Sequence, residues 1–466
     1  MPIDLPSPPV PSSSRLGRWR GRVLRHFPPL RGGKSNTFTA GALLLLLTAC
    51  GPSSDPAAGS QFGADPQLPA PQHGMIPTVH FARPIGWPAG RTPTAGPGLK
   101  VEAYARGLLH PRSLLAMPNG DVLVAETNGP AAPRPRGLRG YAERVVMGMV
   151  GAEAPSMNRI ILLRGRRPDG SAAANYVFIS GLSSPFGMAL VGNNLYVADT
   201  DAVLRFPYDP AATHVAQQGV KVADLPAFPI DDHWTKTLAV SRDSKTLFVS
   251  VGSNSNIGEN GIAAEKGRAL VLAIDLATGQ QRAYATGLRN AVGLDVDPSD
   301  GVLWAVVNER DEIGDNLPPD YLTSVKDGGF YGWPYAYWGK HVDARVKPQR
   351  PDLVAAALTP DYSLGAHVAP LGLVFYQGQA LPPQWRSGAF VGEHGSWNRA
   401  ALSGYKVVFV RFANGRPSGP PVDALTGFLD QKGEAMGRPV GVVEDASGAV
   451  LVADDVGNAV WRITAK

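Results

Sequence analysis

The chain has 466 residues, of which 54 are glycine, 43 are proline and only 18% are charged. A chain of this length can bury a large core, and the abundance of turn-forming residues favours an all-β fold over a helical one. The net charge of +5 originates in the first 34 residues, which hold seven arginines and lysines against one acid, so it does not indicate nucleic-acid binding.

Residues 1–50 have the pattern of a secretory leader. A basic segment precedes an uncharged apolar stretch that is too short to span a bilayer and ends in Leu-Thr-Ala-Cys50. This tetrapeptide resembles the bacterial lipobox, in which the cysteine is lipidated; a free cysteine after an ordinary signal peptide is the alternative. Cys50 is the only cysteine, so no intramolecular disulfide is possible. We expect a protein of the cell envelope, on the periplasmic side, attached to a membrane only through a lipid on Cys50.

Residues 51–98 are rich in proline, alanine, glycine and serine and contain few strand formers. This composition predicts a flexible linker between the leader and the folded part of the chain.

Residues 99–466 contain six similar hairpins, each with an apolar strand, a turn, and a second apolar strand that ends in a polar residue. The hairpins begin at His110, Ser184, His233, Arg289, Ala369 and Arg438. Further apolar strands lie between them, so each unit has room for about four strands, which is the content of a propeller blade. The repeat therefore predicts an all-β fold, a six-bladed β-propeller over residues 99–466.

The hairpin starts carry most of the candidate polar residues. If the first strands are innermost, their starts ring the central channel on one face, and the second strands end on that same face. The residues expected there are His110, His233, Arg289, Asn290 and Arg438, followed by the acids Glu126, Asp199, Glu309, Asp311, Glu393 and Asp454. We expect the first two acids and the last one to be structural, because such residues often bond backbone amides and close turns.

Several motifs follow one another in a fixed order: His233, Arg289-Asn290, the acidic stretch 308–312, GGFYGWP at 328–334, and GEHGSWNR at 392–399. This pattern resembles the glucose/sorbosone dehydrogenase family, quinoproteins that use pyrroloquinoline quinone (PQQ), and is closest to the L-sorbosone dehydrogenase branch. The resemblance implies oxidation of an aldose or a related sugar aldehyde. The electrons would then pass to a respiratory acceptor.

The resemblance also implies roles for single residues. His233 matches the general base, and histidine suits this role because it changes its charge near neutral pH. PQQ carries three carboxylates, which need fixed cations and polar groups. The matching cofactor-binding residues are Arg289, Asn290, Arg399 and Arg438, with His394 as a rival of Arg399 in the same motif.

Calcium assists the quinone in this family and prefers oxygen ligands. The matching backbone carbonyls belong to Arg310 and Asp311, although the glycine-proline pair of the glucose enzymes is replaced here. A second departure concerns the base. Ser253 stands where the glucose enzymes place an aspartate that orients it, and Asp231 or Asp232 are the alternative orienting groups.

Two other functions fit the same fold. Several acids around one channel would also suit a metal-dependent, lactonase-type hydrolase. A non-enzymatic envelope propeller that binds a partner or a glycan is the third possibility, because fold alone does not determine function.

Overall fold

The computed structural model describes residues 59–72, 78–130, 155–227 and 232–466. The leader with Cys50 lies outside the described residues, as does Asp231, so the signal segment and the lipid anchor remain predictions. Within the described part of the chain, no helix has the length and apolar character needed to cross a bilayer.

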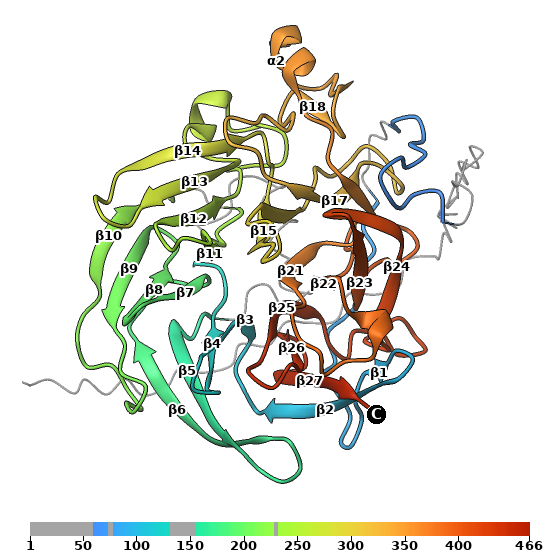
Figure 1. The fold of residues 1–466 in the computed structure, drawn as a ribbon. Helices are drawn as coiled ribbons and strands as arrows, with labels where there is room; N and C mark the ends of the chain where they lie inside the picture. Colours follow the sequence, from blue (N-terminus) through green and yellow to red (C-terminus); the bar gives the residue numbers. More distant parts are fainter. Residues whose placement is uncertain (1–58, 73–77, 131–154, 228–231) are drawn as a thin grey trace, which may run out of the picture. The chain divides into compact units, whose positions relative to one another are not determined.

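Six antiparallel sheets stand around a central axis and form the six-bladed β-propeller that the repeat predicts (Figure 1). Blade 1 contains β3 (Pro111–Ala116), β4 (Val122–Glu126), β5 (Arg159–Arg166) and β6 (Ala172–Ser180). Blade 2 contains β7 (Met188–Val191), β8 (Asn194–Ala198), β9 (Ala202–Pro207) and β10 (Val220–Asp224). Blade 3 contains β11 (Leu238–Val240), β12 (Thr246–Val251), β13 (Leu270–Asp275) and β14 (Gln281–Thr286).

The remaining blades carry the additions. Blade 4 contains β15 (Ala291–Val296), β16 (Leu303–Val307), β17 (Pro319–Ser324) and β20 (Tyr362–Ala366), with an insertion of β18 (Ala336–Tyr337), β19 (His341–Val342) and helix α2 (Pro351–Ala356). Blade 5 contains β21 (Pro370–Phe375), β22 (Gly388–Glu393), β23 (Lys406–Ala413), β24 (Arg416–Thr426) and the short β1 (Thr94–Ala95). Blade 6 contains β25 (Pro439–Glu444), β26 (Val450–Asp454), β27 (Ala459–Ala465) and β2 (Leu99–Arg106).

The innermost strands form a closed ring in which each contacts the innermost strands of its two neighbours; they are β3, β7, β11, β15, β21 and β25. These are the first strands of the six predicted hairpins. Antiparallel pairing places the start of each inner strand opposite the end of the second strand, as with Pro111 opposite Glu126 and Pro370 opposite Glu393. The polar residues at both positions therefore lie on one face of the ring, here called the hub face, as predicted.

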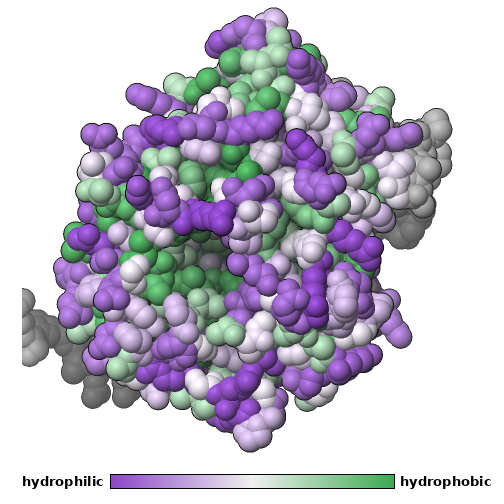
Figure 2. Space-filling view, viewed as in Figure 1, coloured by the Kyte–Doolittle hydropathy of each residue, from purple (hydrophilic) through white to green (hydrophobic). Residues whose placement is uncertain are grey.

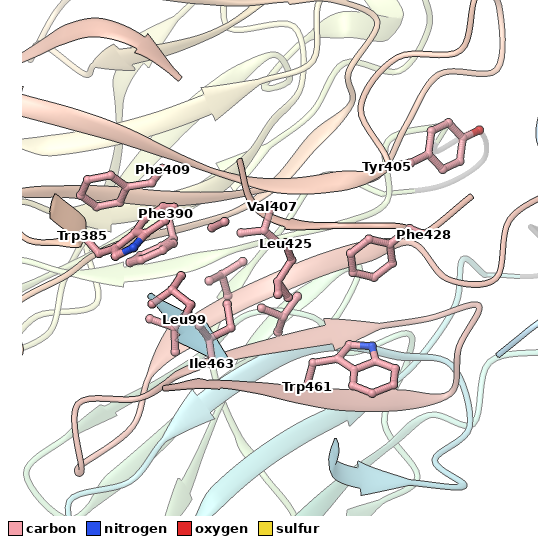
Figure 3. Packing of buried hydrophobic residues seen from close by; sticks show 14 of the residues in the cluster. Leu99, Trp385, Phe390, Tyr405, Val407, Phe409, Leu425, Phe428, Trp461 and Ile463 are labelled. Carbon is pink, nitrogen blue, oxygen red and sulfur yellow. The ribbon is translucent and has the colours of Figure 1, made fainter. Parts of the chain in front are cut away.

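Blade 6 closes the ring by joining the two ends of the propeller. β2 pairs with β27 from Leu99 opposite Ala465 to Arg106 opposite Ala459. A hydrophobic cluster between blades 5 and 6 supports this pairing, and Figure 3 shows its labelled side chains packed together; they are Leu99, Trp385, Phe390, Tyr405, Val407, Phe409, Leu425, Phe428, Trp461 and Ile463. Because this packing joins β2 to β27, blade 6 is complete only when both ends of the propeller segment are in place.

The described residues before β2 differ from the flexible linker that we expected. Thr94 and Ala95 form β1 and pair with β24, and Gly63 pairs with Ser363 of β20. Ala82 is 1% exposed and belongs to the hydrophobic cluster between blades 5 and 6. Composition alone missed this order because the few apolar residues and backbone groups of the stretch find partners on distant blades.

Replacement of Leu99 by alanine tests the closure of the ring. We expect Leu99→Ala to lower the free energy of unfolding by about 2–5 kcal/mol, because the lost side chain leaves a cavity in the closing blade. Urea denaturation measures this change. Val220→Ala is the control, since Val220 lies on the edge strand β10 and is 56% exposed, and it should change stability by less than about 0.5 kcal/mol. Equal losses in the two variants would contradict the closing role of Leu99.

Candidate functional site

His233 lies on the hub face shortly before β11, and Ser253 orients its ring. His233 Nδ1 lies 2.9 Å from the Ser253 carbonyl oxygen and 3.0 Å from the Ser253 hydroxyl oxygen. The Ser253 hydroxyl donates its hydrogen to the carbonyl of Ser255 at 2.6 Å, so both Ser253 oxygens act as acceptors toward the ring. Nδ1 therefore carries the ring hydrogen, and Nε2 keeps a lone pair that can take a proton. Ser253 thus contacts the ring from the position where the resemblance places an orienting aspartate.

The charge state of His233 follows from its surroundings. Burial and then the positive charge of Arg289 lower the pKa of His233 to about 3, although the carbonyl of Ser253 and the carboxylate of Asp311 oppose this effect. The ring is therefore neutral at pH 7, as a general base must be before it accepts a proton.

Gly252 lies between the side chains of His233 and Asn290. A Cβ atom on Gly252 would lie 2.4 Å from the Cβ of His233 and 2.6 Å from Asn290 Oδ1, so only glycine fits at this position. Asn290 Oδ1 is buried and has no hydrogen-bond partner among the described residues. An unpaired buried amide oxygen beside the base is costly, which makes it a candidate for contact with a ligand.

Arg289 is 5% exposed, and all five N–H groups of its guanidinium point at protein acceptors. Nε donates to the carbonyl of Asn256 at 3.1 Å, and Nη1 donates to the carbonyls of Asn308 and Glu309 at 3.3 and 2.7 Å. Nη2 donates to Asn256 Oδ1 at 3.0 Å and to Asp311 Oδ2 at 3.2 Å. Arg289 thus ties blade 3 to blade 4 and has no donor left for a carboxylate ligand in this arrangement.

Asp311 is the anion at the centre of this group. Its Oδ1 accepts a hydrogen bond from Asn398 Nδ2 at 2.6 Å and lies 3.7 Å from His367 Nδ1, while Oδ2 pairs with Arg289. Burial alone would raise the pKa of this carboxyl, but the nearby His367 ring and the charge of Arg289 lower it to about 2. The carboxylate is therefore ionised and joins blade 4 to the Asn398 loop of blade 5.

The carbonyl of Asp311 does not fit the predicted calcium site. Arg310 Nε and Nη2 donate to this oxygen at 2.9 and 2.6 Å, and Asn256 Nδ2 lies 3.4 Å from it. Arg310 Nη1 is also paired with Asp343 of the blade 4 insertion, and both side chains are almost fully buried. A calcium ion at this carbonyl would compete with the guanidinium of Arg310.

Arg438 and Arg399 lie elsewhere on the hub face and have unused donors. Arg438 Nη2 donates to the carbonyl of Ala82 at 3.0 Å and to the Tyr405 hydroxyl at 3.3 Å, and its guanidinium stacks 5.2 Å from the Tyr405 ring centre. Arg399 Nη2 donates to Asn316 Oδ1 at 2.7 Å. The Nε atoms of both arginines are buried, and within the described ranges they have no hydrogen-bond partner.

Asp455 organises a second ionic group that the sequence did not reveal. Its Oδ2 accepts from Arg112 Nη1 at 2.7 Å and contacts His394 Nε2 at 2.9 Å, and His110 Nε2 lies 3.8 Å away. Burial raises the pKa of Asp455, but the charges of His394, His110 and Arg112 hold it far below the usual range. Arg112 stands two residues after His110, and Asp455 stands one residue after Asp454. This closeness to an aligned hairpin position is the only signal in the sequence that marks them. The 394–399 loop links this group to Asp311 through Asn398.

The acids predicted to be structural are confirmed in that role. Glu126 accepts the backbone N–H of Leu109 at 2.7 Å, Asp199 that of Ser183 at 2.9 Å, and Asp454 that of Arg438 at 2.8 Å. These bonds close the turns that lead into the inner strands, so the three acids shape the hub face.

Comparison with known proteins places this architecture in a family. The TrAA12-like family model matches residues 171–324 and 351–466, which is more than half of the chain. The chain belongs to the TrAA12-like family. The match includes His233, Arg289, Arg310 and the 394–399 loop, so both ionic groups lie largely within the part that defines the family.

Two relatives match this TrAA12-like chain over most of its length. An uncharacterized protein of Borreliella burgdorferi is 29% identical over 298 residues, covering 62% of this chain and 77% of that protein. A pyrroloquinoline quinone-dependent pyranose dehydrogenase of Coprinopsis cinerea is 25% identical over 429 residues, covering 78% of this chain and 54% of that protein. The chain thus spans about half the length of the latter relative.

Solved structures show the same fold. The calcium structure of the Trichoderma reesei family AA12 enzyme has a TM-score of 0.65 at 21% identity and covers 84% of this chain and 99% of that one. The holo form of the pyranose dehydrogenase PQQ domain of Coprinopsis cinerea has a TM-score of 0.64 at 23% identity and covers 83% and 100%. The expected resemblance to PQQ-dependent sugar dehydrogenases is confirmed, whereas these relatives do not single out the L-sorbosone branch.

The low pKa of His233 gives a pH prediction. In the unfolded chain a histidine takes up its proton near pH 6.5, whereas folded His233 does so only near pH 3, so protonation favours the unfolded state over this window. We expect the free energy of unfolding to fall as the pH drops from 6.5 toward 3, and less steeply in His233→Gln. Histidine NMR titration should show His233 neutral above about pH 4; a midpoint near 6.5 would contradict the assignment.

The role of Arg289 gives a stability prediction. Arg289→Ala should lower the free energy of unfolding by about 3–5 kcal/mol, because it leaves buried carbonyls and the Asp311 carboxylate without their cation. Arg282 is the matched control, since it forms a two-point pair with Asp327 but is more than half exposed. Arg282→Ala should cost less than about 1 kcal/mol in the same thermal or urea measurement. Similar losses would show that Arg289 does not link the blades.

Proposed function

We propose that this chain is a PQQ-dependent oxidoreductase that oxidises the CH–OH group of a sugar or a related aldehyde hydrate, with an L-sorbosone-like aldose as the substrate class. The observation that carries the proposal is a neutral histidine, oriented by Ser253, beside an arginine-rich hub on a propeller of the TrAA12-like family. The name of the Coprinopsis cinerea relative, a PQQ-dependent pyranose dehydrogenase, supports the same chemistry.

The residues on the hub face fit an anionic, planar cofactor. PQQ supplies a quinone that accepts two electrons from the substrate. Its carboxylates need cations with unused donors, and Arg438 and Arg399 have them, whereas Arg289 is fully engaged by the protein. The orphaned Asn290 Oδ1 and the buried Nε atoms of the two arginines are satisfied when polar cofactor groups reach them.

His233 acts as the general base in this proposal. Its Nε2 lone pair takes the proton of the substrate hydroxyl, while Nδ1 keeps its hydrogen bond to Ser253 and holds the ring in place. Asp311 favours the protonated ring, whereas burial and Arg289 oppose it, so the proton is held only until it passes on to solvent. Gly252 keeps the ring close to Asn290 because no larger residue fits between them.

The only support for calcium comes from comparison with a solved structure of the same fold. The Trichoderma reesei structure of this fold is named for calcium. In this chain the Asp311 carbonyl is occupied by Arg310, so the base step described above makes no use of a metal. Titration of PQQ with and without calcium measures whether the ion contributes.

The location and the acceptor complete the proposal. The basic leader and the lipobox-like Cys50 support a lipid-anchored protein on the periplasmic side of a membrane. A tightly held quinone must be reoxidised after each turnover, which supports a respiratory electron acceptor as the partner. Among the described residues, no group of three or more His, Cys, Asp or Glu side chains is arranged to hold a metal ion.

Reconstitution of the purified protein tests the proposal. PQQ added to the full chain should bind with a measurable change in absorbance, and dye reduction should follow with at least one aldose of a sugar panel. Absence of PQQ binding, or of dye reduction across the panel, would overturn it. Lactone hydrolysis without PQQ would favour the hydrolase.

The His233→Gln variant assigns the base. It should bind PQQ within about threefold of the wild type and reduce the dye about 100-fold more slowly, because a general base contributes 10²–10⁴-fold. Arg438→Ala is the complementary variant and should weaken PQQ binding by about tenfold, because it removes a charge-assisted contact. A His233→Gln enzyme that turns over at the wild-type rate would exclude the residue as the base.

A further inference from the structure

Residues 78–95, here called the strap, run across the hub-face loops of blades 5 and 6 before they reach β2. His80 bonds both ends of one turn of the 394–400 loop. Its backbone N–H donates to the carbonyl of Trp397 at 2.9 Å, and its ring Nδ1 lies 2.7 Å from the carbonyl of Ala400. This turn carries Asn398, which contacts Asp311, and Arg399. His80 therefore fixes a turn that holds two residues of the hub.

The strap also contacts Arg438 directly. The carbonyl oxygen of Ala82, which is almost completely buried, accepts from Arg438 Nη2 at 3.0 Å. A few residues on, Ile85 N–H donates to the carbonyl of Ala435, and Ala435 N–H donates to the carbonyl of Arg83, both at 2.8 Å. The strap thus pairs with the segment that leads into Arg438 and holds one edge of its guanidinium.

Trp87 provides the third contact. Its Nε1 donates to Asp454 Oδ2 at 2.7 Å, and the other oxygen of this carboxylate accepts the backbone N–H of Arg438 at 2.8 Å. A Cβ atom on Gly437 would lie 2.6 Å from Trp87 Nε1, so the indole sits directly on the residue before Arg438. The ring also packs edge-on against Phe428 and Trp461. Trp87 therefore restrains the backbone on which the arginine is mounted.

These contacts are not needed to complete the sheets of the blades. Apart from the two residues of β1, all strands of the six sheets lie within residues 99–466. The contacts of His80, Ala82 and Trp87 converge instead on two loops, 394–400 and 436–438, that carry the candidate cofactor-binding arginines. The hydrogen bonds of His80 and Ala82 act on these loops directly, and that of Trp87 acts through Asp454, which accepts the backbone N–H of Arg438.

We propose that the strap is a positioning element for the cofactor site, with His80 and Trp87 as positioning residues for Arg399 and Arg438. The proposal rests on the proposed function in that the ligand of these arginines is the carboxylated quinone. By ordering both loops before the ligand arrives, the strap lowers the entropy cost of binding.

Variants of the full chain test the strap through PQQ affinity. His80→Ala removes the ring contact to Ala400, and Trp87→Phe removes the N–H donor to Asp454 while it keeps an aromatic ring. Each should weaken PQQ binding at least threefold in an absorbance titration, while circular dichroism shows a folded protein. His80→Asn, which restores a donor at the position of Nδ1, should recover most of the affinity.

Arg83→Ala is the matched control within the strap. Arg83 pairs with Glu434, but its side chain is 69% exposed and contacts neither arginine. Its loss should change PQQ affinity by less than twofold. Wild-type affinity in both His80→Ala and Trp87→Phe, or equal loss in all three variants, would overturn the positioning role.

Hydrogen exchange of the cofactor-free protein separates this proposal from the proposed function. Backbone amides of residues 394–400 and 436–440 should exchange at least threefold faster in His80→Ala and Trp87→Phe than in the wild type, and at the wild-type rate in Arg83→Ala. Unchanged exchange in the two strap variants would overturn the strap proposal even if PQQ binds. If PQQ does not bind the wild type, the proposed function fails, while faster exchange would still show that the strap orders the loops.

Discussion

Charges removed from water must be paired, and this requirement shapes the hub of the propeller. Asp455 is buried and Asp311 is partly buried, and both carboxylates are held ionised. Asp311 is paired with Arg289 and stands beside His367. Asp455 has Arg112 and two histidines as its partners. Each carboxylate draws its partners from different blades, so the ionic pairs fix the relative positions of loops that no single sheet would hold together.

The same pairing decides which cations remain available to a ligand. All five N–H groups of Arg289 donate to the loops around Asp311. The guanidinium of Arg310 pairs with Asp343 and donates to a backbone carbonyl. In the part of the chain that the structure describes, Arg438 and Arg399 keep buried N–H groups without a partner. An arginine that matches a family motif therefore does not automatically contact the ligand, because it can serve by holding the site in shape.

The base depends on backbone geometry as much as on charge. Ser253 holds His233 through its carbonyl and its hydroxyl, and Gly252 permits the ring to approach Asn290. Residues 78–93 belong to none of the six sheets, but they bond the loops that carry Arg399 and Arg438. The centre of the ring is hollowed on the face drawn in Figure 2, and the inner strands of all six blades surround it.

The sequence by itself determined the six blades, their inner strands and the polar residues that begin them. Alternating apolar residues, glycine-rich turns and the position of His233 or Arg289 at a strand start are local features, each contained in a stretch of about twenty residues. Only the tertiary structure decided what those residues do. Arg112 meets Asp455 across 343 residues and Arg438 meets Ala82 across 356, and these contacts exist only when the ring has closed. Local patterns place a residue on a face of the propeller. The partners that determine its charge state, and which of its donors remain unused, come from other blades.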